Sequence, residues 1–571
     1  MTKVEYMTSE SELLTAIAKE YWEAFLANEP LNATSLGDRR YDDKLPDKSQ
    51  AGIGRIEQQY ERFLERAKQL SADRLTPENA LTRTALLVEL ESQLSYIRCH
   101  LEEWVVDPLD GPQIEFQNLE SYQPVRTPTE ARAMVKRWEA MAPYFNTHTL
   151  NLQRGISKGR VAIRAAVENV IDETQSLLAK PDQEWPLLRP LIVNHSDWRV
   201  EERKEFESGL KKAVRNHVRP ALASYVQFLG SNLLPRSRDE NLPGICHIPG
   251  GTESYRRLIR VHTSLGLTPE ELHETGLMEV GRINSEMEAL GAKVLGTRSR
   301  KEVLERLRND SSLYFATRDE VAKKAEDALA RAKAAISKWF GRLPKTDCVV
   351  VRMGEHEEEH STIAYYRPLA ADGSRPGQYY INTSHPETRP RYEAEALAYH
   401  ESIPGHHLQI AIAAELEGLP EFRRYNGVTA FIEGWGLYTE RLADEMGLYS
   451  SDLDRIGVLS YDAWRACRLV VDTGMHAKQW TRDQAIDYMI ENTALAKNNI
   501  VNEVDRYITW PGQALAYKTG QLEILRLREE AKRKLGSAFN IREFHNAVLS
   551  NGAIPLEALR RTVAEYCNGK V

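Results

Sequence analysis

The chain has 571 residues, of which 42% are hydrophobic and 28% charged, and its formal net charge is −8. These values are typical of a globular protein, and the mixed charges exclude a broad basic surface for nucleic acid. There is no run of about 18 apolar residues and no apolar signal-peptide core near the N-terminus. We therefore expect no membrane segment and a cytoplasmic location.

The cysteines exclude two further classes of protein. Their number is odd, they are scattered, and there is no CxxC pattern, so a disulfide-stabilised secreted fold is not expected. None lies beside a histidine pair, so cysteine-ligated zinc is not expected either. The five are Cys99, Cys246, Cys348, Cys467 and Cys567.

The first 240 residues have a helical pattern. Ser9 and Glu12 form the sequence signature of a capping box, and apolar residues follow it at helical spacing. Long charged stretches at 50–110 and 127–230 continue the pattern. The stretch 231–255 is rich in proline, glycine and asparagine. We therefore place a boundary near residue 240, between an N-terminal helical lobe (1–240) and a second lobe (241–571).

The second lobe begins with helices and then contains the one convincing β region. Thr268-Pro269 with Glu271 predicts a helix start. The stretches CVVVRM, TIAYYRP and GQYYINT, between 348 and 383, are short and rich in β-branched and aromatic residues. They predict a small antiparallel sheet. It either merely covers the helix that follows or offers an edge strand to a peptide.

The stretch HESIPGHH, at 400–407, lies within the predicted helices of 392–447. A histidine followed by a glutamate, with a second histidine about a turn later, is typical of zinc hydrolases. The imidazoles bind the metal, and the glutamate is the base toward the attacking water. His400 is the first predicted ligand, and Glu401 is the predicted base.

The spacing departs from H-E-x-x-H because position i+4 is Pro404. On a regular helix His406 would point about 240° away, and His407 would lie about 10 Å further along. Pro404 and Gly405 disfavour a regular helix, so a bulge at 402–405 is expected. The bulge favours His406 as the second ligand, with His407 as the alternative.

A catalytic zinc takes three protein ligands and an open fourth position. The helix predicted at 427–447 offers two carboxylates, Glu433 and Glu440. We predict Glu433 as the third ligand. Glu440 either hydrogen-bonds a ligating histidine or is a solvated charge.

Three later residues are candidates for transition-state stabilisation. His476 follows Asp472 by four residues in a mostly apolar helix, and it is either a core histidine or reaches the substrate. Tyr507 and Tyr517 could stabilise an oxyanion beside the metal, although tyrosines also pack well in cores.

These stretches resemble those of the DUF885 family, of which HExxPGHH followed by EGWxLYxE is the hallmark. Further matches run in order along the chain, from ATSLGDRRYD and IPGGTESY to EVDRYITWPGQALAYKTG and FHNAVLSNGAIPL. The family looks like a branch of the helical gluzincins, which include oligoendopeptidases, thermostable carboxypeptidases and angiotensin-converting enzyme.

The resemblance implies a mainly α fold, with two helical lobes around a deep cleft. It matches His400 and His406 to the histidine ligands, Glu401 to the base and Glu433 to the glutamate ligand, and it places Tyr507 and Tyr517 near the oxyanion. Many relatives look exported, whereas this chain shows no signal peptide.

The sequence thus predicts a Zn²⁺ metallopeptidase that hydrolyses short peptides. Two alternatives stay open. One is a non-catalytic helical protein with a structural metal or a peptide-binding cleft, and the other is a zinc amidase acting on a non-peptide amide. The sequence does not choose between endo- and exo-action, and it does not give the oligomeric state.

Overall fold

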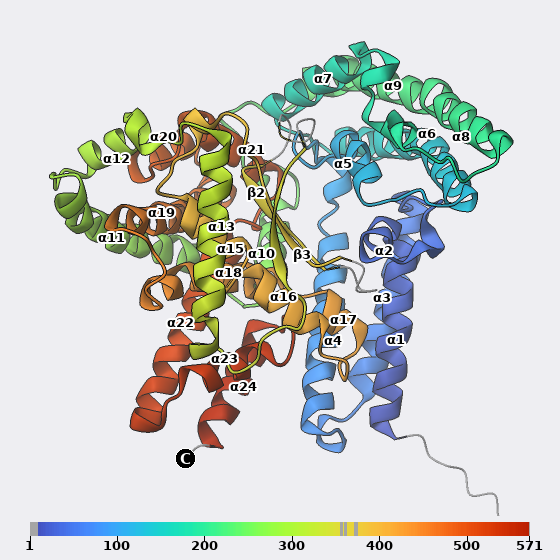
Figure 1. Cartoon of the computed structure of the whole chain (residues 1–571). Helices are drawn as coiled ribbons and strands as arrows, with labels where there is room; N and C mark the ends of the chain where they lie inside the picture. The colour runs from blue at the N-terminus through green and yellow to red at the C-terminus, as the bar shows by residue number, and fades with distance from the viewer. Residues whose placement is uncertain (1–8, 355–357, 359–361, 370–374, 570–571) are drawn as a thin grey trace, which may run out of the picture.

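The computed structural model of the protein describes residues 9–354, 358, 362–369 and 375–569. The fold is mainly α-helical with one small sheet, which confirms the expected class. Figure 1 shows the strands at the centre of the molecule, between the N-terminal helices (blue) and the C-terminal helices (orange and red).

The N-terminal helices begin at caps that the sequence provides. The capping box predicted at Ser9 and Glu12 opens α1, and Thr127 and Glu130 form another at α6. Buried apolar faces form one core among α1 to α4 and a second among α6 to α9. The helices are α1 (Glu10–Asn28), α2 (Pro30–Leu36), α3 (Gln50–Gln69), α4 (Pro77–Ile97), α5 (Pro112–Asn118), α6 (Pro128–Ser157), α7 (Arg164–Ala179), α8 (Val200–Ala213) and α9 (Arg219–Phe228).

The remaining helices surround the sheet. The start predicted at Thr268 is confirmed as a capping box on α11. The helices before the sheet are α10 (Gly251–Thr263), α11 (Pro269–Val294), α12 (Arg300–Asn309) and α13 (Arg318–Ala335). Those after it are α15 (Ala394–Glu401), α16 (His406–Ala414), α17 (Glu421–Tyr425), α18 (Thr429–Glu445), α19 (Asp452–Ala477), α20 (Arg482–Asn492), α21 (Lys497–Thr509), α22 (Leu515–Leu535), α23 (Ile541–Leu549) and α24 (Leu556–Asn568).

The sheet lies where predicted, but it is mixed, so the expectation of an antiparallel sheet was wrong. Its strands are β1 (Cys348–Arg352), β2 (Ala364–Arg367) and β3 (Gly377–Ile381), in the order β1-β3-β2. β3 pairs parallel with β1 and antiparallel with β2. β3 takes the centre, where Tyr379 and Ile381 are buried in the core shared with α15 and α18. The chain therefore does not fold β1 and β2 into a hairpin.

A network of buried ion pairs joins α11, α18, α19 and α22. The ammonium of Lys518 on α22 is fully buried and lies 2.6 Å from Asp462 on α19 and 3.0 Å from Glu279 on α11. Arg441 on α18 also binds Asp462. Breaking a buried pair leaves an uncompensated charge, which costs several kcal/mol, so these contacts hold the four helices in one arrangement.

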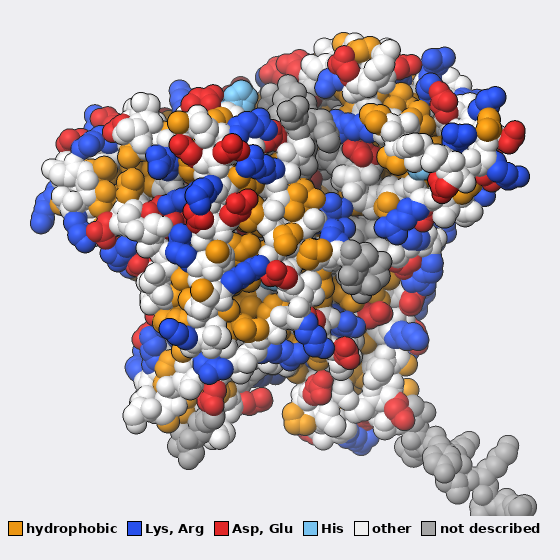
Figure 2. All heavy atoms as spheres, viewed as in Figure 1, with side chains coloured by type: hydrophobic (Ala, Val, Ile, Leu, Met, Phe, Trp, Pro, Cys, Tyr) orange, Lys and Arg blue, Asp and Glu red, His pale blue; other side chains and the backbone are white. Residues whose placement is uncertain are grey.

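The division into two lobes, 1–240 and 241–571, around a deep cleft stays a prediction. Within the described part of the chain, no helix combines the length and apolarity needed to cross a bilayer. Figure 2 shows Lys and Arg side chains interspersed with Asp and Glu over the visible face, so charge of one sign is not segregated there.

Candidate metal centre

The helix that carries the two histidines is interrupted at the predicted bulge. α15 ends at Glu401, and α16 begins at His406. Between them the Ile403–Pro404 peptide is cis, and the indole of Trp435 donates to the carbonyl of Pro404 at 3.0 Å. A Cβ at position 405 would lie 1.9 Å from the carbonyl oxygen of His400, so only glycine fits this turn.

The break brings His406 beside His400. Their ring centroids are 4.6 Å apart, with the rings nearly perpendicular. Oε2 of Glu433 on α18 lies 3.6 Å from Nε2 of His400 and 3.5 Å from Nε2 of His406. The three ligand atoms lie within 4.8 Å of one another, so the predicted trio converges on one point. We refer to it as the metal cluster.

Glu440 hydrogen-bonds the ring nitrogen of His400 that faces away from the metal cluster. Its carboxylate is 1% exposed and lies 2.8 Å from Nδ1 of His400. Nδ1–H donation to a carboxylate leaves the Nε2 lone pair free to face the metal cluster. Glu433 and Glu440 share a face of α18, two turns apart, so one helix provides both contacts to His400.

Electrostatics favour a cation at this point. Burial opposes the charge on Glu433, but hydrogen bonds with His400 and His406 hold its pKa well below its usual range. Burial also opposes protonation of His400, yet Glu433 and Glu440 raise its pKa to about 9. Burial raises the pKa of Glu401 against the opposing effect of both histidines. The carboxylate of Glu433 is therefore a negative charge that either protonated histidines or a bound metal ion would balance.

The alternative ligand, His407, faces away from the cluster. Its Nδ1 lies 3.0 Å from the Tyr366 hydroxyl and its Nε2 lies 3.1 Å from the Thr346 carbonyl oxygen. Burial lowers its pKa to about 4. Both ring nitrogens are thus engaged with the strand region, and the geometry favours His406 over His407.

Tyr517 is brought to the cluster by a close helix crossing. A Cβ on Gly434 of α18 would lie 2.4 Å from the backbone of Gly520 on α22, and one on Gly520 would lie 1.7 Å from the carbonyl of Ala430. Glu433 and Tyr517 stand next to this crossing. Burial and the nearby Glu433 carboxylate raise the pKa of Tyr517, which keeps its phenol protonated.

Tyr507 is placed differently, because its hydroxyl is already saturated. It accepts from Nε1 of Trp464 at 3.1 Å and from Nε of Arg468 at 2.9 Å, and it donates to Glu503 at 2.6 Å. Donation to an oxyanion would first require the bond to Glu503 to break. Between the two predicted tyrosines, the geometry favours Tyr517.

His476 lies in a separate buried group. Its Nδ1 accepts from the backbone N–H of Ile245 at 3.0 Å, and its Nε2 lies 2.9 Å from the backbone oxygen of Tyr507. Burial lowers its pKa to about 3. Both nitrogens hold the backbone of other segments, and no described contact joins His476 to the metal cluster. The predicted catalytic role has no support from this placement.

Two residues near the cluster were not predicted from the sequence. Arg465 and Arg468 lie on α19, with side chains 5% and 3% exposed. Nη2 of Arg465 lies 3.8 Å from Glu440, and the guanidinium of Arg468 lies 4.4 Å from the centre of the Tyr517 ring. Their signal was present in RACRLVV, where two arginines interrupt an apolar helix.

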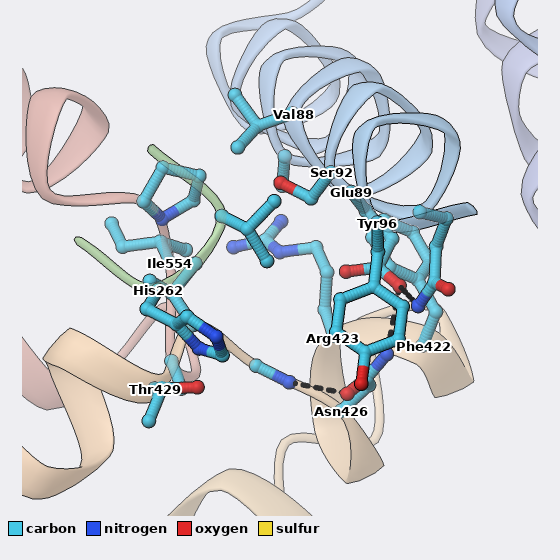
Figure 3. Close-up of a pocket in the computed structure, with 17 residues that line it drawn as sticks. Val88, Glu89, Ser92, Tyr96, His262, Phe422, Arg423, Asn426, Thr429 and Ile554 are labelled. Atoms are coloured by element: carbon cyan, nitrogen blue, oxygen red, sulfur yellow. Dashed lines mark hydrogen bonds between the residues drawn. The ribbon is translucent and has the colours of Figure 1, made fainter. Parts of the chain in front are cut away.

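A cavity of about 280 Å³ lies between α4, α10, α17 and the start of α18, and none of the residues of the metal cluster lines it. Figure 3 shows α4 on one side of it, with Glu89 and Tyr96, and His262 on the other. Thr429, which also lines it, is one helical turn before Glu433 on α18. The cavity thus lies between the N-terminal helices and the helix that carries the third predicted ligand.

Comparison with known proteins agrees with this picture of the fold. The family model described as "Bacterial protein of unknown function (DUF885)" matches residues 30–563. The chain therefore belongs to the DUF885 family, as its motifs predicted. A search of the curated proteins gave no match.

Two solved structures are similar over nearly the whole chain. One is described as a "putative lipoprotein" from Colwellia psychrerythraea, with 26% identity and a TM-score of 0.92, covering 99% of this chain and 100% of its own. The other is described as a "putative lipoprotein of unknown function" from Shewanella oneidensis, with 19% identity and a TM-score of 0.74, covering 97% and 99%. The second likeness concerns the fold alone.

Proposed function

We propose that the protein is a zinc-dependent peptidase that hydrolyses short peptides. The observation that carries the proposal is the convergence of His400, His406 and Glu433, with Glu401 directly after the first histidine. Two imidazoles and one carboxylate suit zinc and leave a fourth position open. Nδ1 of His400 is held by Glu440, as is usual for a metal-binding histidine.

The residues of the chain have distinct parts in this reaction. Bound zinc would supply Lewis acidity toward the peptide carbonyl and acidify water. Glu401 takes the proton from the attacking water and delivers it to the leaving amine. Tyr517 donates a hydrogen bond to the oxygen that gains charge. Glu440 keeps His400 in the tautomer that faces the cluster.

The experiment combines metal content and peptide hydrolysis. We expect about one zinc per chain by elemental mass spectrometry and cleavage of short peptides from a mixed library. Glu401→Gln should keep the zinc and lower turnover by about 10²- to 10⁴-fold. Full activity in this variant would sink the mechanism. Glu445→Gln is the control, since it changes an exposed glutamate that pairs with Arg528 away from the cluster.

The proposed location follows the described relatives. Because the structure that is 26% identical is described as a lipoprotein, we infer a location at the cell envelope rather than in the cytoplasm. Fractionation of cells that express the native gene tests this, and recovery in the cytoplasmic fraction alone would restore the original expectation.

A further inference from the structure

Three arginines gather beside the metal cluster. Nη2 of Arg465 lies 3.8 Å from Glu440, whose carboxylate also holds Nδ1 of His400. The guanidinium of Arg468 lies against the ring of Tyr517, whose phenol is near enough to the Glu433 carboxylate for that charge to raise its pKa. Arg465 and Arg468 are three residues apart and share a face of α19, so this face is turned toward the cluster. The third is Arg506 on α21.

These arginines have few close carboxylate partners among the described residues. Glu503 binds both Arg468, at 2.9 Å, and Arg506, at 3.0 Å. Arg465 has only long contacts, 3.8 Å to Glu440 and 3.5 Å to the carbonyl of Tyr461. Glu440 is also shared with His400. Glu503 is therefore the only carboxylate within 3.0 Å of these guanidinium groups among the described residues, while Glu393 and Glu401 act on Arg465 from further away.

Some of their donors are unused. Nη1 of Arg468 and Nε of Arg465 are buried and have no hydrogen-bond partner among the described residues. Leaving a buried charged donor unsatisfied is costly. A bound anion would supply the missing acceptors.

Aromatic rings fix the orientation of these groups. The guanidinium of Arg465 lies 4.4 Å from the ring centre of Tyr461 and 4.3 Å from that of Trp464. Arg468 lies 4.5 Å from Trp464 and 4.4 Å from Tyr517. Such stacking immobilises the planar group before a ligand arrives, which lowers the entropic cost of binding.

We propose that Arg468, assisted by Arg465 and Arg506, binds a carboxylate group of the substrate. Guanidinium groups match carboxylates in shape and charge. This inference rests on the proposed peptidase function and deepens it, because it makes peptides that carry a carboxylate near the scissile bond the preferred substrates. The carboxylate belongs either to the peptide C-terminus or to an acidic side chain.

The test measures binding separately from cleavage. Three probes differ only at the end: N-acetyl-trialanine as the free acid, the same peptide as the amide, and an amidated peptide ending in glutamate. Their dissociation constants are measured by calorimetry on Glu401→Gln, which leaves peptides intact. At least one carboxylate probe should bind on the order of 10- to 100-fold more tightly than the neutral amide.

Variants in the same background identify the residue. Arg468→Met should reduce the ratio between carboxylate and amide binding to near one, and Arg468→Lys should retain part of it. Arg528→Met is the matched control: Arg528 is 4% exposed and pairs with Glu445 away from the cluster, and this variant should keep the full ratio. If Arg468→Met fails to fold, a several-fold fall in the ratio for Arg468→Lys carries the test.

The outcomes separate the two proposals. Equal binding of all three probes, no binding of any, or an unchanged ratio in the Arg468 variants overturns the carboxylate site. Carboxylate-selective binding without cleavage by the wild type supports the site and overturns the peptidase. Cleavage without selectivity does the reverse. Tight binding of the free acid assigns the site to the C-terminus, and tight binding of the glutamate peptide assigns it to a side chain.

Discussion

The metal cluster and the group around His476 contain the same residue types, a buried histidine beside carboxylates, but connect them differently. In the first, the Nε2 atoms of His400 and His406 turn toward a shared carboxylate. In the second, both nitrogens of His476 bind backbone groups, and Asp472 accepts from the Tyr255 hydroxyl and the Gly512 N–H. The comparison shows that the role of a buried histidine depends on what its ring nitrogens face, not on its burial or its neighbours in sequence.

The largest expected effect separates the two adjacent histidines of the first region. His406→Ala should lose the metal completely, because it removes one of three ligands, whereas His407→Ala should retain about one equivalent. Elemental mass spectrometry after dialysis measures both. Loss of metal in His407→Ala with retention in His406→Ala would show that His407 is the ligand.

A smaller effect on metal binding is expected for Glu440, which contacts a predicted ligand without being one. Glu440→Gln keeps the shape of the side chain but weakens the acceptor for Nδ1 of His400, and the zinc affinity should fall about 10- to 100-fold. Competition with a chelator gives the affinity. Glu445→Gln, on the same helix but paired with Arg528, is the control. Equal affinities for Glu440→Gln and the wild type would make Glu440 irrelevant to the metal.

The second region should respond in stability and not in metal content. His476→Ala creates a cavity and leaves the Ile245 N–H unsatisfied, so the free energy of unfolding should fall by about 3 kcal/mol. Urea unfolding measures this, and the zinc content should stay near one per chain. Loss of zinc from a folded variant would join the two regions and contradict the comparison.

The smallest effect is a pH dependence in the second region. Burial raises the pKa of Asp472 to about 7, against hydrogen bonds from Tyr255 and Gly512. The folded state therefore binds this proton more tightly than the unfolded chain, and the stabilisation is lost as pH rises toward 7. Relative to Asp472→Asn, the wild type should lose about 1 kcal/mol of unfolding free energy per pH unit between about pH 5 and 6. Denaturant unfolding at several pH values measures both proteins. If the unfolding free energies of the wild type and Asp472→Asn change equally with pH, the prediction is wrong.

The sequence predicted the features that depend only on neighbouring residues in the chain. The capping boxes at Ser9 and Thr268 and the break at Pro404 depend on a few adjacent residues, and all three are present. The hydrogen bond from the Tyr507 hydroxyl to Glu503 could also have been predicted, because Glu503 precedes Tyr507 by four residues on the same helix face. The interpretation of Tyr507 as an oxyanion donor overlooked this neighbour.

The rest depends on contacts between distant segments. The order of the strands follows from which strand the core buries, and strand patterns alone do not state this. The sequence already favoured His406 over His407, and the contacts of His407 with the distant residues Tyr366 and Thr346 agree with that preference. Arg465 and Arg468 were missed because an arginine in an apolar helix does not reveal which distant residues it will contact, here Glu440 and Tyr517.

The contact between Gly434 and Gly520 limits how this protein could be engineered. Neither backbone can accept a side chain there, and the buried Lys518, two residues before Gly520, holds α22 in place. A change that shifts α18 relative to α22 would therefore displace Glu433 as well. Substitutions of the residues that α4 and α10 present to the cavity of Figure 3 would leave this helix crossing intact.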